Sequence, residues 1–278
     1  MKDLVFGDLH LKNFVPGYLE SQLSTIRQCI HDEDRFEEDI IDRIIFLGDI
    51  FERRRPSVKV LLAFKRFLED LDYLCPKARI YLLRGNHDSM TKADDGISAL
   101  GLFNAYGNVV LHSHREITKF EKENYVFIPH YEDEEQIYEG MKLAKDDDII
   151  FGHFGYTGCL NSIGDNDFSI NPSAFPADTI LGHIHTFKRN KPVSEEEKNV
   201  IVLGTPYTTS FQESGKTSYY GVLYDKEDPI DLKREKFVPM GNKYLVLKKV
   251  NSGPKYMSMP LVEVEGRLDE INSSSHFV

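Results

Sequence analysis

The chain has 278 residues, of which 41% are hydrophobic, and a formal net charge of −11 at pH 7. A chain of this length and apolar content can bury a sizeable core, so we expect a globular protein. The acidic balance argues against a protein coated by nucleic acid or by an anionic membrane, so any polyanion must be held locally or by a metal.

The N-terminal stretch MKDLVFGDLH enters a strand at once, and the chain has no run of about 20 apolar residues that would suggest a membrane span. Cys29, Cys75 and Cys159 lie far apart and form no CxxC pair, so neither a disulfide framework nor a structural zinc site is indicated. We therefore expect free thiols in a soluble cytoplasmic protein.

Short apolar runs bounded by Gly, Pro or Asp alternate with longer amphipathic segments along the chain. The short runs predict strands; they lie at residues 4–6, 44–47, 80–83, 125–128, 149–151, 179–181, 200–203 and 219–224. Helical patterning fits residues 18–31, 57–74 and 134–144. In the second of these, Pro56 and Ser57 favour a helix start, and apolar residues form one stripe. The alternation predicts a layered α/β domain.

After residue 225 the chain becomes polar, and it then contains a basic strand-like piece, KYLVLKKV, and the end NSSSHFV. We expect a main domain at residues 1–225 and a short C-terminal appendage, a peripheral tail or reduced capping region, at residues 226–278.

Two similar stretches, LVFGDLH and IIFLGDIF, each place Gly-Asp directly after a buried strand. Parallel strands deliver their C-terminal ends to one edge of a sheet, so Asp8 and Asp49 are expected to face one another there. Asp after a strand is also a common helix cap, and that alternative stays open for either residue alone.

Five histidines occur in similar strand-end contexts, namely GDLH, GNHD, FGHFG and GHIH. In extended backbone, residues i and i+2 point to the same side, so Asp8 with His10 and His183 with His185 can each grip one centre. A single His beside Gly is more often an ordinary hydrogen-bonded residue than a ligand. Four Gly-led segments that carry Asp, Asn or His together indicate a metal site; the histidines are His10, His87, His153, His183 and His185.

Carboxylate, imidazole and amide ligands without thiolate suit Mn²⁺, Fe²⁺ or Zn²⁺ in five- or six-fold coordination. Seven candidate ligands are enough for two ions that share one bridging Asp. Such a pair clamps a phosphoryl group and activates a water, so the expected chemistry is hydrolysis of a phosphate ester.

The segments GDLH, GDIFERRRPS, GNHDS, GHF and GHIH, in that order, resemble the five signature motifs of the calcineurin-like metallophosphoesterases over about residues 4–225. The resemblance implies a two-sheet β-sandwich flanked by helices, the four-layer fold of that superfamily. GDIFERRRPS, FIPH and VLGTPYTTSFQES are further similar to the SbcD-type nuclease subunit of DNA-repair complexes, and the compact C-terminal part is most similar to its short phage form.

The resemblance also implies a role for each motif residue. Two divalent ions would be bound, with Mn²⁺ the foremost candidate and Fe²⁺, Zn²⁺ or Mg²⁺ as alternatives. The implied first metal site is Asp8, His10, Asp49 and His185, and the second is Asp49, Asn86, His153 and His183, so that Asp49 bridges. His87 would be the catalytic histidine, which contacts the phosphate and protonates the leaving oxygen, and Asp88 is expected to fix its tautomer.

The sequence departs from the SbcD pattern at Glu52, where many relatives have His or Asp. We retain Glu52 as a candidate substrate contact. Three arginines follow directly, and they indicate either a phosphate contact, for which Arg55 is the preferred candidate, or a solvated charge run. His130 in FIPH is expected either to point toward the cleft as a substrate contact or to be merely packed.

The function that the resemblance implies is a Mn²⁺-dependent DNA nuclease, exonuclease or endonuclease, that works with an SbcC-type SMC-like ATPase, in the host cytoplasm if it is encoded by a phage. The alternative is a stand-alone phosphatase or nucleotide phosphodiesterase of the same superfamily. The resemblance also implies a homodimer built on residues 57–74 and on GISALGLFNAY at 96–106. Both segments carry apolar residues beyond what one sheet face needs, although a thick intramolecular core would explain them equally; they are Leu62, Phe64, Leu68, Leu100, Leu102 and Phe103.

Overall fold

A computed structural model describes residues 2–14, 16–34, 40–120, 124–159, 168–190, 194, 197–207, 209 and 219–223. It describes the backbone alone for residue 224 and for residues 236–239, 245–249 and 260–264. No helix in these parts of the chain is long and apolar enough to cross a membrane. The three cysteines are buried free thiols, as expected.

The first sheet has six strands in the order β12, β11, β1, β2, β3, β4. The middle of the sheet is parallel, because β1, β2, β3 and β4 run in the same direction, whereas β11 is antiparallel to β1. The bounds are β1 (Lys2–Phe6), β2 (Ile41–Phe46), β3 (Arg79–Leu83), β4 (Val109–His112), β11 (Tyr219–Tyr224) and β12 (Lys236–Pro239).

The second sheet also has six strands, in the order β5, β6, β7, β8, β10, β9, and its four inner strands are parallel. The bounds are β5 (Glu116–Lys119), β6 (Asn124–Ile128), β7 (Ile149–Gly152), β8 (Asp178–Leu181), β9 (Lys188–Asn190) and β10 (Val200–Val202). A separate antiparallel pair is formed by β13 (Leu245–Lys249) and β14 (Pro260–Val264).

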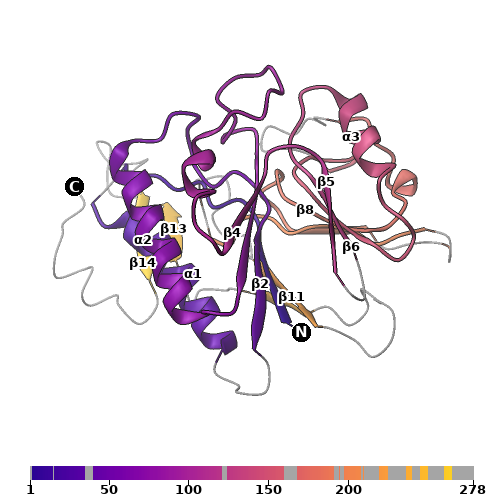
Figure 1. Cartoon of the computed structure of the whole chain (residues 1–278). Helices are drawn as coiled ribbons and strands as arrows, with labels where there is room; N and C mark the ends of the chain where they lie inside the picture. The colour runs from indigo at the N-terminus through magenta and orange to yellow at the C-terminus, as the bar shows by residue number, and fades with distance from the viewer. Residues whose placement is uncertain are drawn as a thin grey trace.

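Helices cover the outer faces of the two sheets, so the described chain forms four layers (Figure 1). The helices α1 (Tyr18–Asp34) and α2 (Val58–Leu74) cover the first sheet, and α3 (Glu134–Met141) packs on the second. Two 3₁₀ turns are η1 (Ala99–Phe103), which packs into the same core as α1 and α2, and η2 (Pro172–Ala174). This arrangement confirms the two-sheet sandwich flanked by helices.

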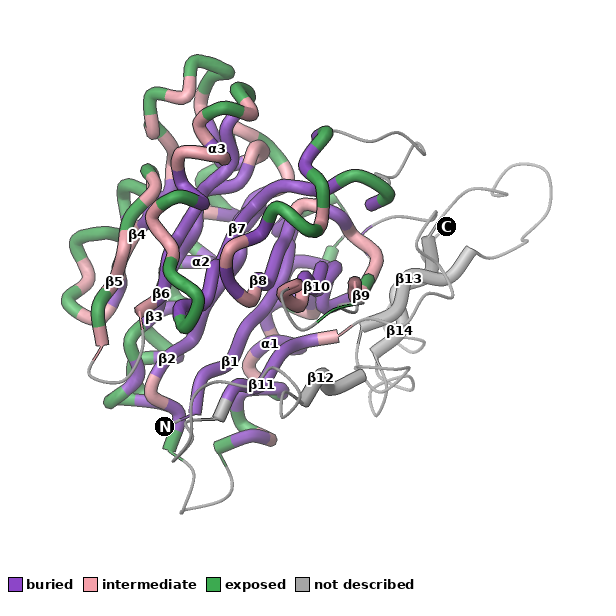
Figure 2. Tube along the Cα trace, turned by 90° about the vertical axis from the view of Figure 1, so that its right-hand side faces the viewer, coloured by how far each residue is buried: buried purple, intermediate pink, exposed green. Residues whose placement is uncertain are grey.

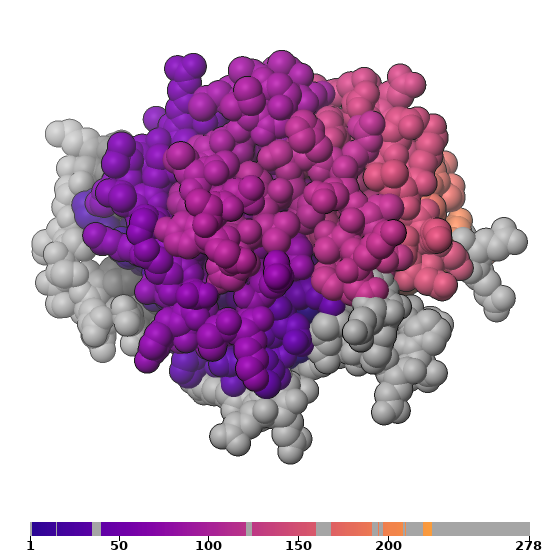
Figure 3. Space-filling model, in the orientation of Figure 1, coloured from indigo at the N-terminus to yellow at the C-terminus, as the bar shows by residue number. Residues whose placement is uncertain are grey.

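Side chains alternate between two cores along each inner strand, as the two-residue period of a strand requires. In β1, Leu4 and Phe6 face the helices, and Val5 faces the second sheet. Ile45 on β2 and Phe127 on β6 belong to the same central core as Val5, which explains the continuous buried band through the strands in Figure 2. In the space-filling view of Figure 3, the purple and magenta part of the chain, which contains most of the first sheet, lies directly beside the pink part, which contains strands of the second.

Helix α2 begins one residue later than the predicted segment, because Ser57 is its N-cap and accepts a hydrogen bond from the backbone N–H of Val60 at 3.4 Å. The predicted helix at 18–31 extends to Asp34, and the predicted helix at 134–144 ends at Met141. Strand β12 lies beyond residue 225 and pairs with β11 of the first sheet.

Most of the apolar residues that indicated a dimer face are explained by the core of the chain itself. Phe64 is fully buried, and its ring meets that of Phe103 edge to face at 5.0 Å between centroids. Leu68 and Leu100 are also buried, whereas Leu62 and Leu102 remain 50% and 65% exposed. Of the six residues predicted for a dimer face, only Leu62 and Leu102 are exposed apolar residues.

Candidate metal centre

The polar motif residues follow the C-terminal ends of five parallel strands, three from the first sheet and two from the second. Asp8, Asp49 and Asn86 come after β1, β2 and β3, and His153 and His183 come after β7 and β8. The two sheets face each other, so these strand ends meet across one cleft. The sheet topology thus brings together side chains that lie as far as 175 residues apart along the chain.

Three of the motif residues have backbone conformations that residues other than glycine rarely adopt. The φ angles of His10, Asp49 and His183 are 44°, 46° and 79°. Left-handed conformations of this kind cost free energy and are concentrated at functional sites. Gly48 has a φ of 99°, and a Cβ atom there would lie 2.4 Å from Nδ1 of His153, so only glycine fits beside that ring.

The first group of converging atoms contains Asp8, His10 and His185. The Nε2 atoms of His10 and His185 lie 2.9 Å apart, and His10 Nε2 lies 3.6 Å from Oδ2 of Asp49. Both carboxylate oxygens of Asp8 accept from the backbone N–H of His183, at 2.9 and 3.0 Å.

The second group contains Asp8, Asp49 and His153. Nε2 of His153 lies 3.1 Å from Oδ1 of Asn86 and 3.3 Å from Oδ1 of Asp49. The same amide oxygen of Asn86 lies 3.1 Å from Nδ1 of His183. The two oxygens of Asp49 therefore face different groups, Oδ2 toward His10 and Oδ1 toward His153.

The electrostatics of the cluster suit bound cations. Burial by itself raises the pKa of Asp49, but the rings of His153, His10 and His87 outweigh burial and hold that pKa well below its usual value. Burial lowers the pKa of His153, but Asp49 and Asp8 outweigh it and raise that pKa to about 9. Buried carboxylates that draw protons onto neighbouring imidazoles are surroundings in which divalent cations are stabilised. The carboxylate, imidazole and amide groups that converge here are ligands that suit the predicted divalent ions.

His87 is fixed at both ends. Its backbone N–H donates to Oδ1 of Asp49 at 2.8 Å, and its ring Nδ1 lies 2.7 Å from the backbone carbonyl oxygen of Glu52. A carbonyl only accepts, so Nδ1 carries the hydrogen and Nε2 is left for another partner. His87 also groups with His10 and Asp49 as a third set of converging donor atoms, so its predicted position beside the ligands, not among them, stays a prediction.

Asp88 makes other contacts than the one expected. Its carboxylate accepts from the backbone N–H groups of Ile50, Phe51 and Gly85, at 3.0 to 3.2 Å. The acceptor for the His87 ring is the Glu52 carbonyl, so the structure gives Asp88 the task of joining the loop after β2 to the loop after β3. Burial, followed by the charge of Asp49, raises the pKa of Asp88 to about 7.

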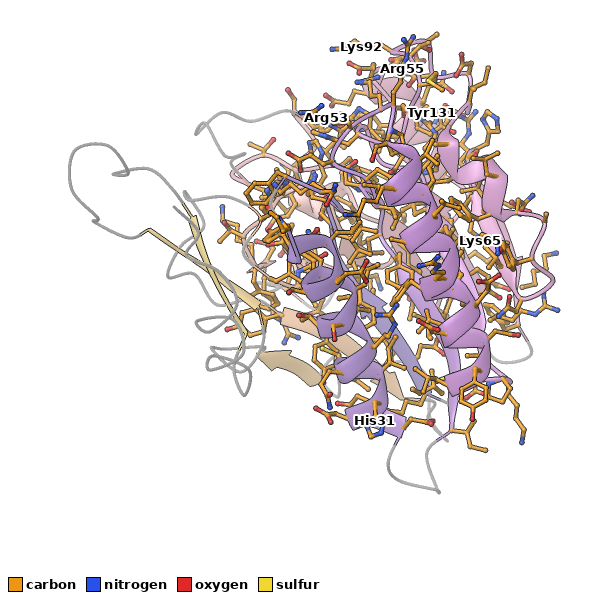
Figure 4. All side chains as sticks on the ribbon, turned by 90° about the vertical axis from the view of Figure 1, so that its left-hand side faces the viewer. His31, Arg53, Arg55, Lys65, Lys92 and Tyr131 are labelled. Carbon is orange, nitrogen blue, oxygen red and sulfur yellow. The ribbon has the colours of Figure 1, made fainter. Side chains whose placement is uncertain are left out.

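A hollow of about 410 Å³ opens onto the cluster. Arg54 lines this hollow, whereas Arg55, the predicted phosphate contact, is exposed outside it. Figure 4 shows Arg53, Arg55 and Lys92 at the same end of the molecule, far from His31 at the other. The lining residues are Asp49, Arg54, Asn86, His87, Lys92, His130, Glu132, Phe168, His183 and His185.

His130 borders the hollow, and it is also packed. Its ring lies 5.5 Å from that of His183 between centroids, and its side chain is 9% exposed. Burial, followed by the neighbouring rings of His183 and His153, lowers the pKa of His130 to about 2, so the ring is neutral. The ring is therefore packed at the edge of the hollow, and its contact with a substrate stays a prediction.

The sequence did not single out Arg54, Lys92, Glu132 or Phe168. Arg54 stands in a run of three arginines, and no periodicity tells which of them turns inward. The other three lie in loops after β3, β6 and β7, where their placement depends on the packing of the two sheets.

Among the comparisons with known proteins, a family model gives the same class. The family model of the calcineurin-like phosphoesterases matches residues 1–232. A comparison with curated proteins finds no match. Similar solved structures include a hypothetical protein from Thermus thermophilus, with 12% identity over 86% of this chain and 98% of that chain and a TM-score of 0.49. They also include a dimetal phosphatase from Danio rerio, with 13% identity over 82% of this chain and 93% of that chain and a TM-score of 0.47.

The two-sheet sandwich and its His/Asp cluster, with the family match, define a metal-dependent phosphoesterase. The chain belongs to the calcineurin-like phosphoesterase family, whose model covers most of its length.

Proposed function

We propose that the chain hydrolyses phosphate esters with two divalent ions held across the cleft, Mn²⁺ being the foremost candidate. Asp8, His10, Asp49 and His185 would hold one ion, and Asp49, Asn86, His153 and His183 the other. The observation that carries the proposal is that the two oxygens of Asp49 face the two groups. A bound pair of such ions would neutralise phosphoryl oxygens and supply an activated water.

His87 supplies the acid in this proposal. With Nδ1–H fixed on the Glu52 carbonyl, a proton on Nε2 would be directed into the hollow that His87 lines. There it would stabilise negative charge on the phosphoryl group and be passed to the leaving oxygen.

The first candidate substrate class is a small phosphate monoester or diester, hydrolysed by a stand-alone phosphatase or nucleotide phosphodiesterase. Membership of the phosphoesterase family supports this candidate directly, because it requires nothing beyond the cleft residues. A second candidate is DNA, with an SbcC-type ATPase as partner, and it rests on the resemblance of the five motifs to SbcD-type nucleases.

One structural observation favours a substrate with more than one phosphate. Arg54 and Lys92 line the same hollow as the cluster. The guanidinium of Arg54 is held by the backbone carbonyls of Ser89 and Thr91, at 3.3 and 2.9 Å, so it is a fixed cation and not a freely moving surface charge. A fixed cation beside a cleft suits a flanking phosphate.

A single assay compares the two candidates. The metal-stripped chain is given Mn²⁺ together with p-nitrophenyl phosphate, its bis ester, or a labelled linear duplex. Cleavage of either small ester supports the proposed phosphate-ester hydrolysis. Cleavage of the duplex would support the second candidate as well, a DNA nuclease. If Mn²⁺ produces hydrolysis of none of the three, the proposal fails.

Arg54→Gln refines the assay. If Arg54 binds a flanking phosphate, the KM for the duplex rises while hydrolysis of the bis ester, which has one phosphate, changes little. An equal loss on both substrates would show that Arg54 supports the cleft in general and would remove the structural argument for DNA.

A further inference from the structure

The carboxylate of Glu52 lies beside a predicted metal ligand and not in the hollow. Its Oε2 atom is 3.2 Å from Nδ1 of His10 and 3.3 Å from Nζ of Lys12. The backbone brings it there, because Leu11 and Phe51 form a bridge and the N–H of Glu52 donates to the carbonyl of Leu11 at 3.3 Å. Glu52 is absent from the residues that line the hollow.

His10 needs an acceptor at this nitrogen. The side chain is 2% exposed, and Nε2 faces His185 and Asp49. A neutral imidazole whose Nε2 lone pair is used for a ligand carries its hydrogen on Nδ1. Within the described chain, Nδ1 makes no well-aligned hydrogen bond, so the carboxylate 3.2 Å away is the group that interacts with it.

Two other rings of the cluster also have an oxygen beside Nδ1, in each case that of a neutral backbone carbonyl. Nδ1 of His153 lies 2.6 Å from the carbonyl oxygen of Leu47, and Nδ1 of His87 lies 2.7 Å from that of Glu52. In these three rings Nδ1 faces an oxygen and Nε2 faces the cleft, but His10 alone of the three has a carboxylate as its partner.

We propose that Glu52 is a positioning residue for the metal centre, and not a substrate contact: it holds His10 as the Nδ1–H tautomer and makes Nε2 a stronger ligand. The inference rests on the proposed function, because it takes His10 to be a ligand of the first ion. A carboxylate behind a metal-bound histidine fixes the ring orientation and raises ligand basicity. The Glu52 backbone carbonyl orients His87 as well, so one residue aligns both histidines.

Lys12 shares this carboxylate and limits its movement. Nζ of Lys12 also donates to the carbonyl oxygen of Thr209 at 2.7 Å, which connects the loop after β1 to the segment after β10. Glu52 is therefore held between a cation and an imidazole within the chain. A carboxylate engaged on both sides in this way is not free to contact a substrate.

The test measures Mn²⁺ affinity of the metal-stripped chain by calorimetry. Glu52→Ala is expected to weaken the binding of one ion by about 10- to 100-fold, the usual effect of losing such a supporting group. Glu52→Gln keeps an oxygen acceptor without the charge and is expected to fall between this variant and the wild type.

Glu132→Gln is the matched control. Glu132 has the same side-chain exposure of 35% and lies at the same cleft, but its partners are Arg54, Lys92 and, at 4.0 Å, His130. It loses the same charge without touching His10, so its Mn²⁺ affinity is expected to stay close to that of the wild type.

A second readout is independent of metal. In ¹⁵N spectra of the metal-free protein, His10 is expected to show the Nδ1–H tautomer in the wild type and a mixture in Glu52→Ala. Wild-type Mn²⁺ affinity in Glu52→Ala, or an equal loss in Glu132→Gln, overturns the proposal. A wild type that binds no Mn²⁺ refutes the proposed function instead, and the tautomer of His10 then decides whether Glu52 positions that ring.

Discussion

At the scale of single residues, the geometry of the cleft depends on side chains that contact more than one group of the cluster. Asp49 shows this most clearly: its oxygens face the two ligand groups, and Oδ1 also accepts from the backbone N–H of His87. Its left-handed backbone places it there at a cost in free energy.

Asp49→Asn is expected to lose one or both ions and to reduce hydrolysis by more than about 100-fold, since a lost bridging ligand should cost at least as much as a lost supporting residue. Asparagine keeps the shape and an acceptor for the His87 N–H, so the fold should persist. Metal analysis and turnover on the bis ester check this. A variant with two bound ions and unchanged turnover would show that Asp49 does not bridge.

His87→Ala separates binding from chemistry. Because His87 is assigned to the phosphate, the variant should retain both ions but lose about 100- to 1,000-fold in kcat, the scale of removing one donor to a developing charge. Metal content and kcat are measured on the same preparation. Loss of an ion would place His87 among the ligands, as its grouping with His10 and Asp49 allows.

The motif residues that converge at the cleft could be predicted from the sequence. The other side chains around them could not. Strand ends and Gly-Asp spacing lead to Asp8 and Asp49, because the topology of parallel strands fixes where those residues lie. Arg54, and not Arg55, turns toward the hollow, and Glu52 turns toward His10. These side-chain directions arise in an irregular loop, so no helical or strand periodicity in the sequence predicts them.

At the scale of elements, β4 carries a buried histidine between the sheets. The ring of His112 stacks on Phe127 of β6, 3.9 Å between centroids, and on Tyr81 of β3 at 5.9 Å. Burial lowers the pKa of His112 to about 4, although the carboxylate of Glu116 acts in the opposite direction.

This pKa predicts a loss of stability in acid. Above the unfolded-state value of 6.5, His112 is neutral in both states and has no effect. Between 6.5 and about 4 the unfolded chain binds a proton that the folded chain does not, so the free energy of unfolding falls as the pH falls. The full loss is about 3 kcal/mol.

His112→Phe isolates the effect, since phenylalanine keeps the stacking without titrating. From about pH 7 to about pH 4.5, the wild type should lose about 2 to 3 kcal/mol more unfolding free energy than the variant in denaturant titrations. Parallel pH curves for the two proteins would show that His112 is not protonated on unfolding.

The inner strands were predicted from the sequence, but the edge strands were not. Strands β1, β2, β7 and β8 are apolar runs that are buried on both faces, which a single sequence reveals. Strands β5 and β9 have the sequences EITK and KRN, and they are strands only because a neighbour pairs with them. Edge strands of this kind are polar, so their sequences resemble loops.

At the scale of the whole molecule, the predicted homodimer depends on the apolar residues that the chain leaves exposed. Leu62 on α2 and Leu102 on η1 are such residues, while Phe64 is part of the core. A charged substitution such as Phe64→Glu would therefore unfold the chain and would not report on association.

We propose that Leu62 and Leu102 contribute to a two-fold interface. Leu62→Glu and Leu102→Glu should each give a folded monomer that still hydrolyses the bis ester, whereas Tyr73→Glu, at the other end of α2 and 86% exposed, should associate as the wild type does. Light scattering decides the matter. A wild-type chain that is already monomeric at high concentration would contradict the proposed dimer.

We propose that two ions across this cleft carry out phosphate-ester hydrolysis. The most direct test of this proposal is the rate of bis-p-nitrophenyl phosphate hydrolysis by the metal-stripped chain as Mn²⁺ is added back, plotted against ions bound per chain. We predict no hydrolysis without metal and a rate that reaches its maximum only when the second ion is bound. A maximal rate with one ion, or a rate that does not depend on bound Mn²⁺, would contradict it.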